Sequence, residues 1–301
     1  MNGVIVIDKP EDFTSFDVVA VVRRETRQRK TGHTGTLDPN ATGVLPILLG
    51  SATKAQDIIL NHDKSYLATF KLGLVSDTLD IWGDCRPFSE KKVEKADVES
   101  LIPEFTGEIE QIPPMYSAIK INGQRLYDLA RQGVEVERKS RKVTVYNLAL
   151  TDFDEAQQSG TLEIDCSKGT YVRTIIDDIG RKLGTGAVMT SLRRTKACGY
   201  SLEDCISLDK LKELCESGEI TDKIKSPESL FAELELISVS QAQAKRFANG
   251  GALDISRTAL AKKNFANGDI FRVGQREGGF LGLGIADKEE NLLKIYKLFK
   301  N

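Results

Sequence analysis

The sequence predicts an α+β protein that ends in a small β-barrel. Its 301 residues are enough for two domains. Segments of helical period and segments of strand period follow one another without regular alternation, which favours α+β over a doubly wound sheet. From about Leu236, short strand candidates are separated by glycine-rich turns, as is typical of a small barrel. We therefore expect one domain at 1–234 and a second at 235–301.

The first elements follow from local patterns. Residues 3–7 alternate with β-branched side chains and predict a strand. Thr14 and Ser15 are candidate N-caps for a helix. The apolar face of that helix is predicted to be Phe16, Val19 and Val22, and a cationic stretch follows at 23–30. The next expected segments are a polar loop at 31–43, a buried apolar run at 44–49, a strand at 64–73 and a polar loop at 77–80.

The later elements follow from the same kinds of local pattern. Ile112–Tyr116, with two prolines, interrupts regular structure before a strand, an Asn122-Gly123 turn and a helix. The Ser226-Pro227 pair predicts a linker. The remaining expected helices lie around 96–101, from about 173 to 184 and at 207–217, and the strands at 143–152, 160–166, 188–200, 270–273, 280–286 and 292–296.

Charge alone argues against a nucleic-acid partner, because the net charge is −2 and the pI is near 5.9. The distribution of charge allows one. Basic residues predominate in 23–46, 116–146 and 168–196, whereas acidic residues predominate in 203–235. Charges farther apart than about 8 Å are largely screened at physiological salt, so a basic face can bind RNA in an acidic protein. Such runs are also common on ordinary solvated surfaces.

Several classes of protein are disfavoured. Apolar runs reach six residues or so, at 44–49, far below the roughly 20 that cross a bilayer. The first residues lack the pattern of a signal peptide. Five cysteines without a CxxC pair suit reduced thiols, so we expect a cytoplasmic protein. With two histidines, no zinc-ligand spacing, no P-loop and no dinucleotide motif, we expect carboxylate chemistry without metal or cofactor.

The strongest local signal is Gly32–Pro39. Its two glycines allow a tight backbone, and His33, Thr34 and Thr36 supply hydrogen-bonding groups. Pro39 favours an extended conformation at Asp38 and so a stiff loop, which is what a positioned nucleophile requires. An isolated Asp-Pro pair is also a common start of a turn.

The fifteen residues 32–46, GHTGTLDPNATGVLP, closely resemble the active-site motif of the TruB family of tRNA pseudouridine synthases. The similarity covers essentially residues 1–200. It continues through Asp8-Lys9-Pro10, Lys64–Tyr66, Leu72-Gly73, Asp77–Asp80, Ile112–Ile119, Gly123, Leu126–Gly133, Cys166–Arg173, Asp177, Asp178 and Leu192–Arg194. The tail resembles, less distinctly, the RNA-binding PUA barrel of such enzymes. The resemblance implies a mixed, largely antiparallel central sheet flanked by helices.

The resemblance also implies roles. Asp38 corresponds to the nucleophile, Tyr66 to a tyrosine that stacks on the flipped uracil, and Arg173 to an arginine paired with the nucleophile. Asp80 corresponds to a second carboxylate of that network, and His33 to a histidine that takes the place of the extruded base. An RNA-gripping thumb is expected at about 112–140. The further residues expected to bind substrate are Gly32, Thr36, Lys9, Tyr171, Lys120, Arg125, Arg131, Arg193 and Arg194.

The implied reaction is the isomerisation of uridine 55 in the tRNA T-arm by a monomer without cofactor. Whether Asp38 attacks the sugar or promotes a glycal-type elimination stays open. Without the motif, Tyr66 and Tyr171 read as packing residues, Arg125 and Arg131 as a solvated face, and Asp77 as a loop cap. Two other functions also stay open: a non-catalytic RNA-binding protein, and a glycosidic-bond hydrolase that pairs Asp38 with Asp80.

Overall fold

A computed structural model describes residues 1–301 apart from 61, 118, 122, 276, 277, 300 and 301. The predicted turn at Asn122 therefore lies partly outside the described residues. The chain forms two compact units, one of 1–38, 45–61 and 198–301, the other of 39–44 and 62–197. Each unit is described by itself. Within the described ranges, no helix has the length and apolarity that a membrane crossing requires.

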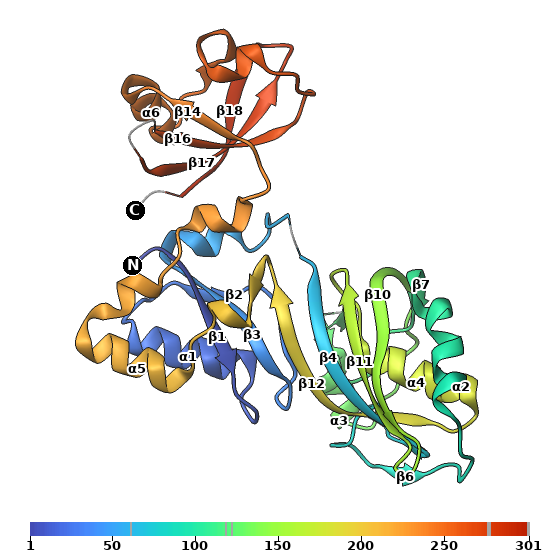
Figure 1. The fold of residues 1–301 in the computed structure, drawn as a ribbon. Coiled ribbons are helices and arrows are strands. Elements are labelled where there is room, and N and C mark those ends of the chain that lie inside the picture. Colours follow the sequence, from blue (N-terminus) through green and yellow to red (C-terminus); the bar gives the residue numbers. More distant parts are fainter. Residues whose placement is uncertain (61, 118, 122, 276–277, 300–301) are drawn as a thin grey trace. The chain divides into compact units, whose positions relative to one another are not determined.

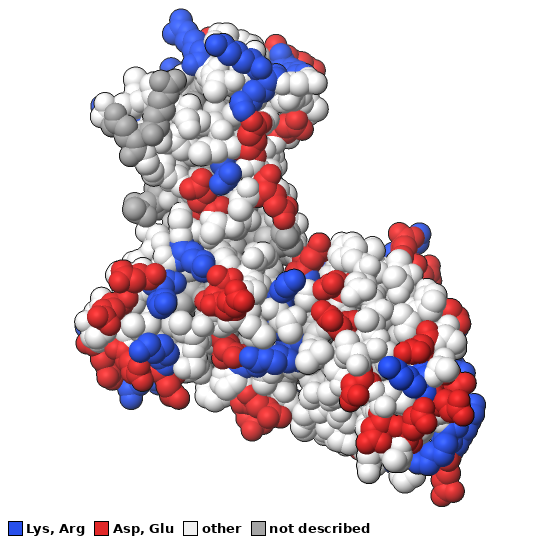
Figure 2. All heavy atoms as spheres, viewed as in Figure 1, with Lys and Arg blue, Asp and Glu red and all other residues white. Residues whose placement is uncertain are grey.

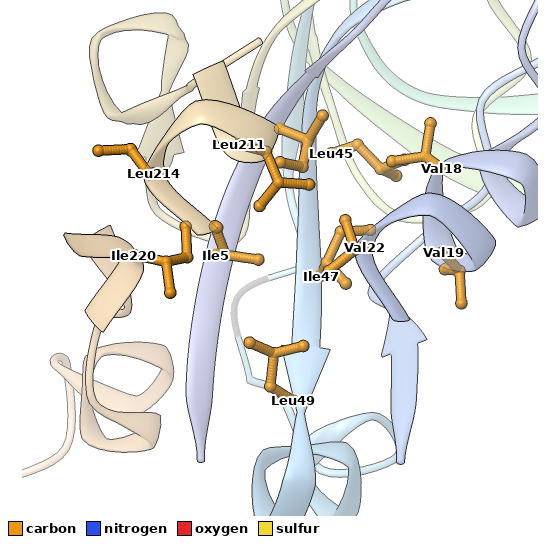
Figure 3. Close-up of a cluster of buried hydrophobic side chains, with 11 residues drawn as sticks. Ile5, Val18, Val19, Val22, Leu45, Ile47, Leu49, Leu211, Leu214 and Ile220 are labelled. Carbon is orange, nitrogen blue, oxygen red and sulfur yellow. The ribbon is translucent and has the colours of Figure 1, made fainter. Parts of the chain in front are cut away.

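The N-terminal part of the first unit is a small sheet covered by two helices. Strand β1 (Gly3–Lys9) neighbours β3 (Thr42–Leu49), which pairs antiparallel with β2 (Thr31–His33). Helices α1 (Ser15–Glu25) and α5 (Leu208–Ser217) pack on one another. The buried side chains that join these elements are Ile5, Ile7, Val18, Val19, Val22, Leu45, Ile47, Leu49, Leu211, Leu214 and Ile220 (Figure 3).

Helix α1 begins where its caps predict. Thr14 and Asp17 form a capping box in which each side chain accepts the backbone N–H of the other residue. The predicted apolar face was wrong at Phe16, which is 69% exposed. The buried positions are Ser15, Val18, Val19 and Val22, and Phe16 lies about 100° around the helix from Ser15.

The C-terminal part of the first unit has a sheet and a core of its own. Its strand order is β14-β16-β17-β18-β15, and the sheet is strongly curled (Figure 1). The order has two ends among the described strands, so a closed PUA-like barrel stays a prediction. The elements are β14 (Leu236–Val239), α6 (Gln241–Ala248), β15 (Leu253–Asp254), β16 (Ile270–Gln275), β17 (Phe280–Asp287) and β18 (Leu292–Leu298).

The Ser226-Pro227 pair does not begin an open linker. Residues Pro227–Phe231 form a 3-10 turn in which Leu230 and Phe231 are buried. The Phe231 ring packs against Phe280 and Phe299 at centroid distances of 6.5 and 5.6 Å. The linker prediction missed this turn, because its aromatic partners lie 49 and 68 positions farther along the chain.

The second unit is built on a sheet in the order β3-β12-β4-β11-β10-β7, with the first residues of β3 at one edge (Figure 1). The β3–β12 pair is parallel and the others are antiparallel, so the expected mixed, largely antiparallel sheet is confirmed. The strands are β4 (Lys64–Leu72), β7 (Gly107–Gln111), β10 (Arg141–Asp154), β11 (Ser159–Cys166) and β12 (Ala187–Ala197).

Helix α4 (Val172–Leu183) lies against this sheet, and its N-terminal turn carries Arg173. A β-carbon at Gly180 would come within 2.3 Å of the backbone nitrogen of Ala187, so this glycine lets α4 approach β12 closely. Gly184 ends the helix in the left-handed conformation, with φ of 70°. The other elements of the unit are β5 (Leu74–Val75), β6 (Arg86–Pro87), α2 (Lys95–Leu101), β8 (Lys120–Ile121), β9 (Gln124–Arg125) and α3 (Leu126–Arg131).

Charge is unevenly spread over the surface. Figure 2 shows many acidic side chains in the region of α5, where the sequence 203–235 is acidic. Lysines lie among them, and some are paired, as Lys210 is with Glu213. An acidic surface of this kind repels phosphate groups.

Candidate active site

The loop that carries Asp38 is fixed from both sides within the first unit. The N–H of Thr34 donates to the carbonyl of Pro46. Ser15, at the start of α1, is buried, and its hydroxyl accepts the N–H of Leu37 at 2.8 Å and donates to the carbonyl of Leu37 at 3.2 Å. Because Leu37 is itself buried, the backbone is held immediately before Asp38, which is half-buried.

Replacing Ser15 tests whether this clamp positions Asp38. We expect Ser15→Ala to slow the chemical step about tenfold or more, because small displacements of a reacting group are costly. It should also reduce stability by about 1–2 kcal/mol, since two buried hydrogen bonds are lost. The measurements are single-turnover kinetics and urea unfolding.

The matched control for Ser15→Ala is Thr26→Val. The buried hydroxyl of Thr26 donates to the carbonyl of Val22 inside α1, far along the helix from Asp38. Thr26→Val should lose comparable stability at an unchanged rate. Equal rate losses in the two variants would show that Ser15 acts only through general stability.

Three further motif residues, Gly32, His33 and Thr36, lie on the same segment as Asp38, whereas Lys9 ends β1. His33 ends β2 opposite Ile47, Gly32 is half-buried, and Thr36 is exposed. Lys9 has no solvent exposure, and its ammonium donates to the carbonyls of Pro10 at 2.8 Å and Phe13 at 2.5 Å. A direct contact between Lys9 and RNA would require it to leave these carbonyls.

Arg173 is the centre of a buried polar cluster in the second unit. Its side chain is 5% exposed. Nη1 donates to the carbonyl of Thr78 at 2.7 Å and lies 3.6 Å from Oδ2 of Asp80, while Nη2 donates to the carbonyl of Tyr116 at 2.9 Å. The planar guanidinium thus has acceptors in several directions, which fixes its orientation.

The loop around Asp80 is held in an unusual conformation. Leu79 has a φ of 63°, a left-handed conformation that costs a non-glycine residue about 1 kcal/mol or more. Backbone hydrogen bonds pin it, because Met189 N–H donates to Leu79 and Ile81 N–H donates to Met189. The Asp80 carboxylate accepts from the Thr78 hydroxyl at 2.6 Å and from the N–H of Trp82 at 3.2 Å. Strained, over-determined loops of this kind are common at functional sites.

Tyr66 lies in the middle of the sheet and is 7% exposed. On β4 it stands opposite Ile164 of β11 and Arg194 of β12. Arg194 is fully buried, and its Nε donates to the carbonyl of Val44 at 2.7 Å, so an RNA contact would require this side chain to become exposed. Arg193 is half-buried and donates to the hydroxyl of Thr42 at 3.2 Å.

The remaining predicted contacts lie around the proposed thumb. Lys120, Arg125 and Arg131 are exposed. The guanidinium carbons of Arg125 and Arg131 lie 5.7 and 5.6 Å from the ring centre of Tyr127. The backbone of Tyr171 exchanges two hydrogen bonds with the side-chain amide of Gln111, and its ring lies 4.8 Å from the guanidinium of Arg141.

Sequence reasoning missed Ser15 and Tyr116 as parts of this arrangement. Ser15 was predicted only as a helix cap, and Tyr116 only as part of an irregular segment. Asp77 is more than a loop cap: Oδ1 accepts the N–H of Asp84 at 2.8 Å, and Oδ2 accepts the Tyr116 hydroxyl at 3.1 Å. The available signal for Tyr116 was a tyrosine two positions after the Pro113-Pro114 pair in the similar stretch.

A cavity of about 510 Å³ adjoins this cluster in the second unit. Thr174, next to Arg173 in α4, and Met115, next to Tyr116, lie in its wall. Its charged lining residues are Asp77, Glu110, Glu135, Asp177, Asp178, Arg138 and Arg181. The excess of carboxylates makes this cavity unsuited to a phosphate.

The ionised carboxylate of Asp178, in the wall of this cavity, lowers the stability of the folded protein, and a substitution can measure this effect. Burial, and then the neighbouring charge of Asp177, raises the pKa of Asp178. The folded state holds the proton more tightly than the unfolded state, so ionisation reduces stability as pH rises from the ordinary carboxyl range through the raised pKa. We expect Asp178→Asn to raise the thermal unfolding midpoint at pH 7, with the gain fading as pH falls towards 4.

The control for Asp178→Asn is Asp152→Asn on β10, where the carboxylate is exposed. It should change the midpoint little at either pH. A stabilisation by Asp178→Asn that is the same at pH 4 and pH 7 would contradict the electrostatic explanation.

Asp38 belongs to the first unit, whereas Tyr66, Asp80 and Arg173 belong to the second. The structure brings the last two together as an ion pair. The pairing of Asp38 with Arg173 stays a prediction. Among the described residues, no group of three or more His, Cys, Asp or Glu side chains is arranged to hold a metal ion.

Comparisons with known proteins agree with one another. Residues 23–172 match the TruB family pseudouridylate synthase N-terminal domain, and residues 173–232 match the tRNA pseudouridylate synthase B C-terminal domain. A protein of Clostridium tetani named tRNA pseudouridine synthase B is 45% identical over 299 residues, 99% of each chain. One of Pseudomonas fluorescens with the same name is 42% identical over 287 residues, 94% of this chain and 91% of that protein.

A solved structure, the crystal structure of a Cbf5-Nop10-Gar1 complex, matches with a TM-score of 0.75 and 26% identity. The match covers 99% of this chain and 85% of that chain. It supports the pseudouridine synthase fold, a mixed sheet with flanking helices. With relatives above 40% identity over nearly the whole length, the chain belongs to the TruB family of pseudouridylate synthases.

Proposed function

We propose that this enzyme isomerises uridine 55 in the T-arm of tRNA to pseudouridine, with Asp38 as the nucleophile and without cofactor. It acts in the cytoplasm as a monomer. The single observation that carries the catalytic assignment is the buried ion pair of Arg173 with Asp80, made of two residues of the family motifs. A buried guanidinium held by carbonyls and a carboxylate is expensive to desolvate, which suits a functional role better than a stabilising one.

The reaction needs no outside atom. The N1–C1′ bond breaks, the base turns, and a C5–C1′ bond forms; the proton leaves C5 and N1 ends protonated. Redox balance is unchanged, which agrees with a sequence that has no cofactor motif. The target uridine lies inside a folded arm, so it must be flipped out at a cost of a few kcal/mol.

The residues then have distinct roles. Tyr66 stacks on the flipped uracil, which returns about 1–3 kcal/mol, and it assists proton transfer at C5. Arg173 keeps the carboxylate of Asp38 ionised and directed at the sugar, while Asp80 and the Thr78 carbonyl hold the guanidinium. His33 fills the space that the base leaves in the RNA.

RNA binding is assigned to exposed cations. Lys120, Arg125 and Arg131 in the proposed thumb contact phosphates, together with the basic stretch at 23–30. The basic patch at 193–196 also contacts phosphates, through Arg193, which is half-buried, and Lys196, which is exposed on the same strand. The tail from 235 onward adds affinity. Because each phosphate contact releases counterions, affinity falls steeply as salt rises.

The test is to incubate the enzyme with an unmodified tRNA transcript and map pseudouridine by carbodiimide primer extension. A single stop at position 55, absent from a transcript with cytidine there, is the expected result. Release of free uracil would instead identify a hydrolase. Salt-dependent binding with no modified nucleotide would identify a non-catalytic RNA-binding protein.

A further inference from the structure

Tyr116 makes one hydrogen bond with its backbone carbonyl and one with its side-chain hydroxyl, and the two bonds reach different residues of the polar cluster around Arg173. Its backbone carbonyl accepts Nη2 of Arg173 at 2.9 Å. Its hydroxyl donates to Oδ2 of Asp77 at 3.1 Å. Asp77 is followed by Thr78, whose carbonyl accepts Nη1 of Arg173 at 2.7 Å. The four residues therefore form a closed ring of hydrogen bonds and chain.

The ring determines where the guanidinium of Arg173 points. Nη1 and Nη2 each have one carbonyl acceptor in the ring, one from Thr78 and one from Tyr116. If Tyr116 moved, Nη2 would lose the Tyr116 carbonyl in a place where the Arg173 side chain is 5% exposed, and the loss of a buried hydrogen bond is costly for a charged donor. The guanidinium would rotate towards a new acceptor, and its direction towards other groups would change.

The hydroxyl end of Tyr116 is suited to hold this ring closed. Burial, followed by the hydrogen bond to Asp77, raises the pKa of Tyr116, so the hydroxyl stays protonated and donates to the carboxylate. The bond is exposed to solvent, and the charge of its acceptor makes it stronger than a neutral hydrogen bond in the same place. Asp77 is fixed in turn, since Oδ1 accepts the N–H of Asp84.

The position of Tyr116 is not fixed by close packing of the preceding segment on α4, so it depends on these hydrogen bonds. The cavity of about 510 Å³ lies beside Met115, Pro114 and Ile112, the residues before Tyr116, and extends to Thr174 of α4. The segment that precedes Tyr116 is therefore not closely packed onto α4 at this point. The two hydrogen bonds of Tyr116 are direct ties between it, the 76–80 loop and Arg173.

We infer that Tyr116 is a positioning residue that links the arrangement of the 112–140 segment to the direction of the Arg173 guanidinium. The inference rests on the proposed function, in which this segment contacts tRNA and Arg173 directs Asp38. When RNA binds and fixes the conformation of the 112–140 segment, Tyr116 fixes the orientation of the Arg173 guanidinium as well. Binding of the correct substrate therefore orients the group that directs Asp38.

The experiment compares Tyr116→Phe with Tyr146→Phe. Tyr146 offers a matched control in the same unit, because its hydroxyl donates to Oδ1 of Asp63 at the same 3.1 Å. Single-turnover tritium release from 5-tritiated uridine in tRNA measures the rate, filter binding the affinity, and thermal unfolding the stability. We expect Tyr116→Phe to slow the rate about tenfold with affinity within twofold, and Tyr146→Phe to change neither.

A double-mutant cycle with Asp77→Ala isolates the bond itself. In the Asp77→Ala background, Tyr116→Phe should have no further effect on the rate. The inference fails if Tyr116→Phe has a normal rate, if its loss is unchanged in the Asp77→Ala background, or if the loss is of affinity. An inactive wild type, or a normal rate for Arg173→Lys, would instead overturn the proposed function.

Discussion

Asp38→Asn is expected to abolish pseudouridine formation while tRNA affinity stays within a few-fold of the wild type. The amide keeps the size and shape of the carboxylate, and the Ser15 clamp on Leu37 keeps the loop in place. What is lost is the negative charge and the nucleophilic oxygen, which an amide cannot supply. In this variant the rate of pseudouridine formation is therefore lost while tRNA affinity is kept.

The measurement for Asp38→Asn is single-turnover tritium release beside filter binding on the same tRNA. A residual rate above about one thousandth of the wild type would show that the nucleophile is misassigned. Asp57→Asn provides the control, because Asp57 is an exposed carboxylate in the same unit. Its rate should stay at the wild-type value.

Arg173→Lys is expected to lower the chemical step by about two orders of magnitude or more at nearly unchanged affinity. Lysine keeps the positive charge, but a single ammonium cannot reach the Thr78 and Tyr116 carbonyls in the directions that the two guanidinium nitrogens occupy. At least one of these half-buried carbonyls then loses its donor, and the positive charge is no longer held in a fixed direction.

The control for Arg173→Lys is Arg181→Lys in the same helix. The Arg181 side chain is 71% exposed and pairs with Asp177 at 2.7 Å. A lysine can make this contact, so the rate should not change. Normal turnover by Arg173→Lys would reduce the Arg173 cluster to a packing feature.

Much of the fold followed from local sequence. The Thr14 cap, the alternation of β4 and the Gly184 helix end were predictable because each depends on a few neighbouring residues. The exposure of Phe16 was not, since residues at the edge of a helical stripe are buried or exposed according to what packs beside them. The turn at Pro227–Phe231 likewise depends on distant aromatic partners.

The residues of the candidate site likewise fall into those that the sequence predicted and those that it did not. Asp38, Tyr66, Asp80 and Arg173 were named because they lie in family motifs. The hydroxyl of Ser15 and the two ends of Tyr116 were missed, because their partners lie 22 to 57 positions away and include backbone carbonyls that carry no sequence signal. The burial of Lys9 and Arg194 is equally invisible in a sequence, where both read as surface cations.

The core in Figure 3 has a consequence for the birth of the protein on the ribosome. Ile5 and Val18 emerge early, but Leu211, Leu214 and Ile220, which cover them, are made roughly 200 residues later. At about 5–20 residues per second, the gap is on the order of 10–40 s. During that time the apolar faces of β1 and α1 lack their final cover, so the nascent chain carries apolar surface that only the segment Leu208–Lys223 buries.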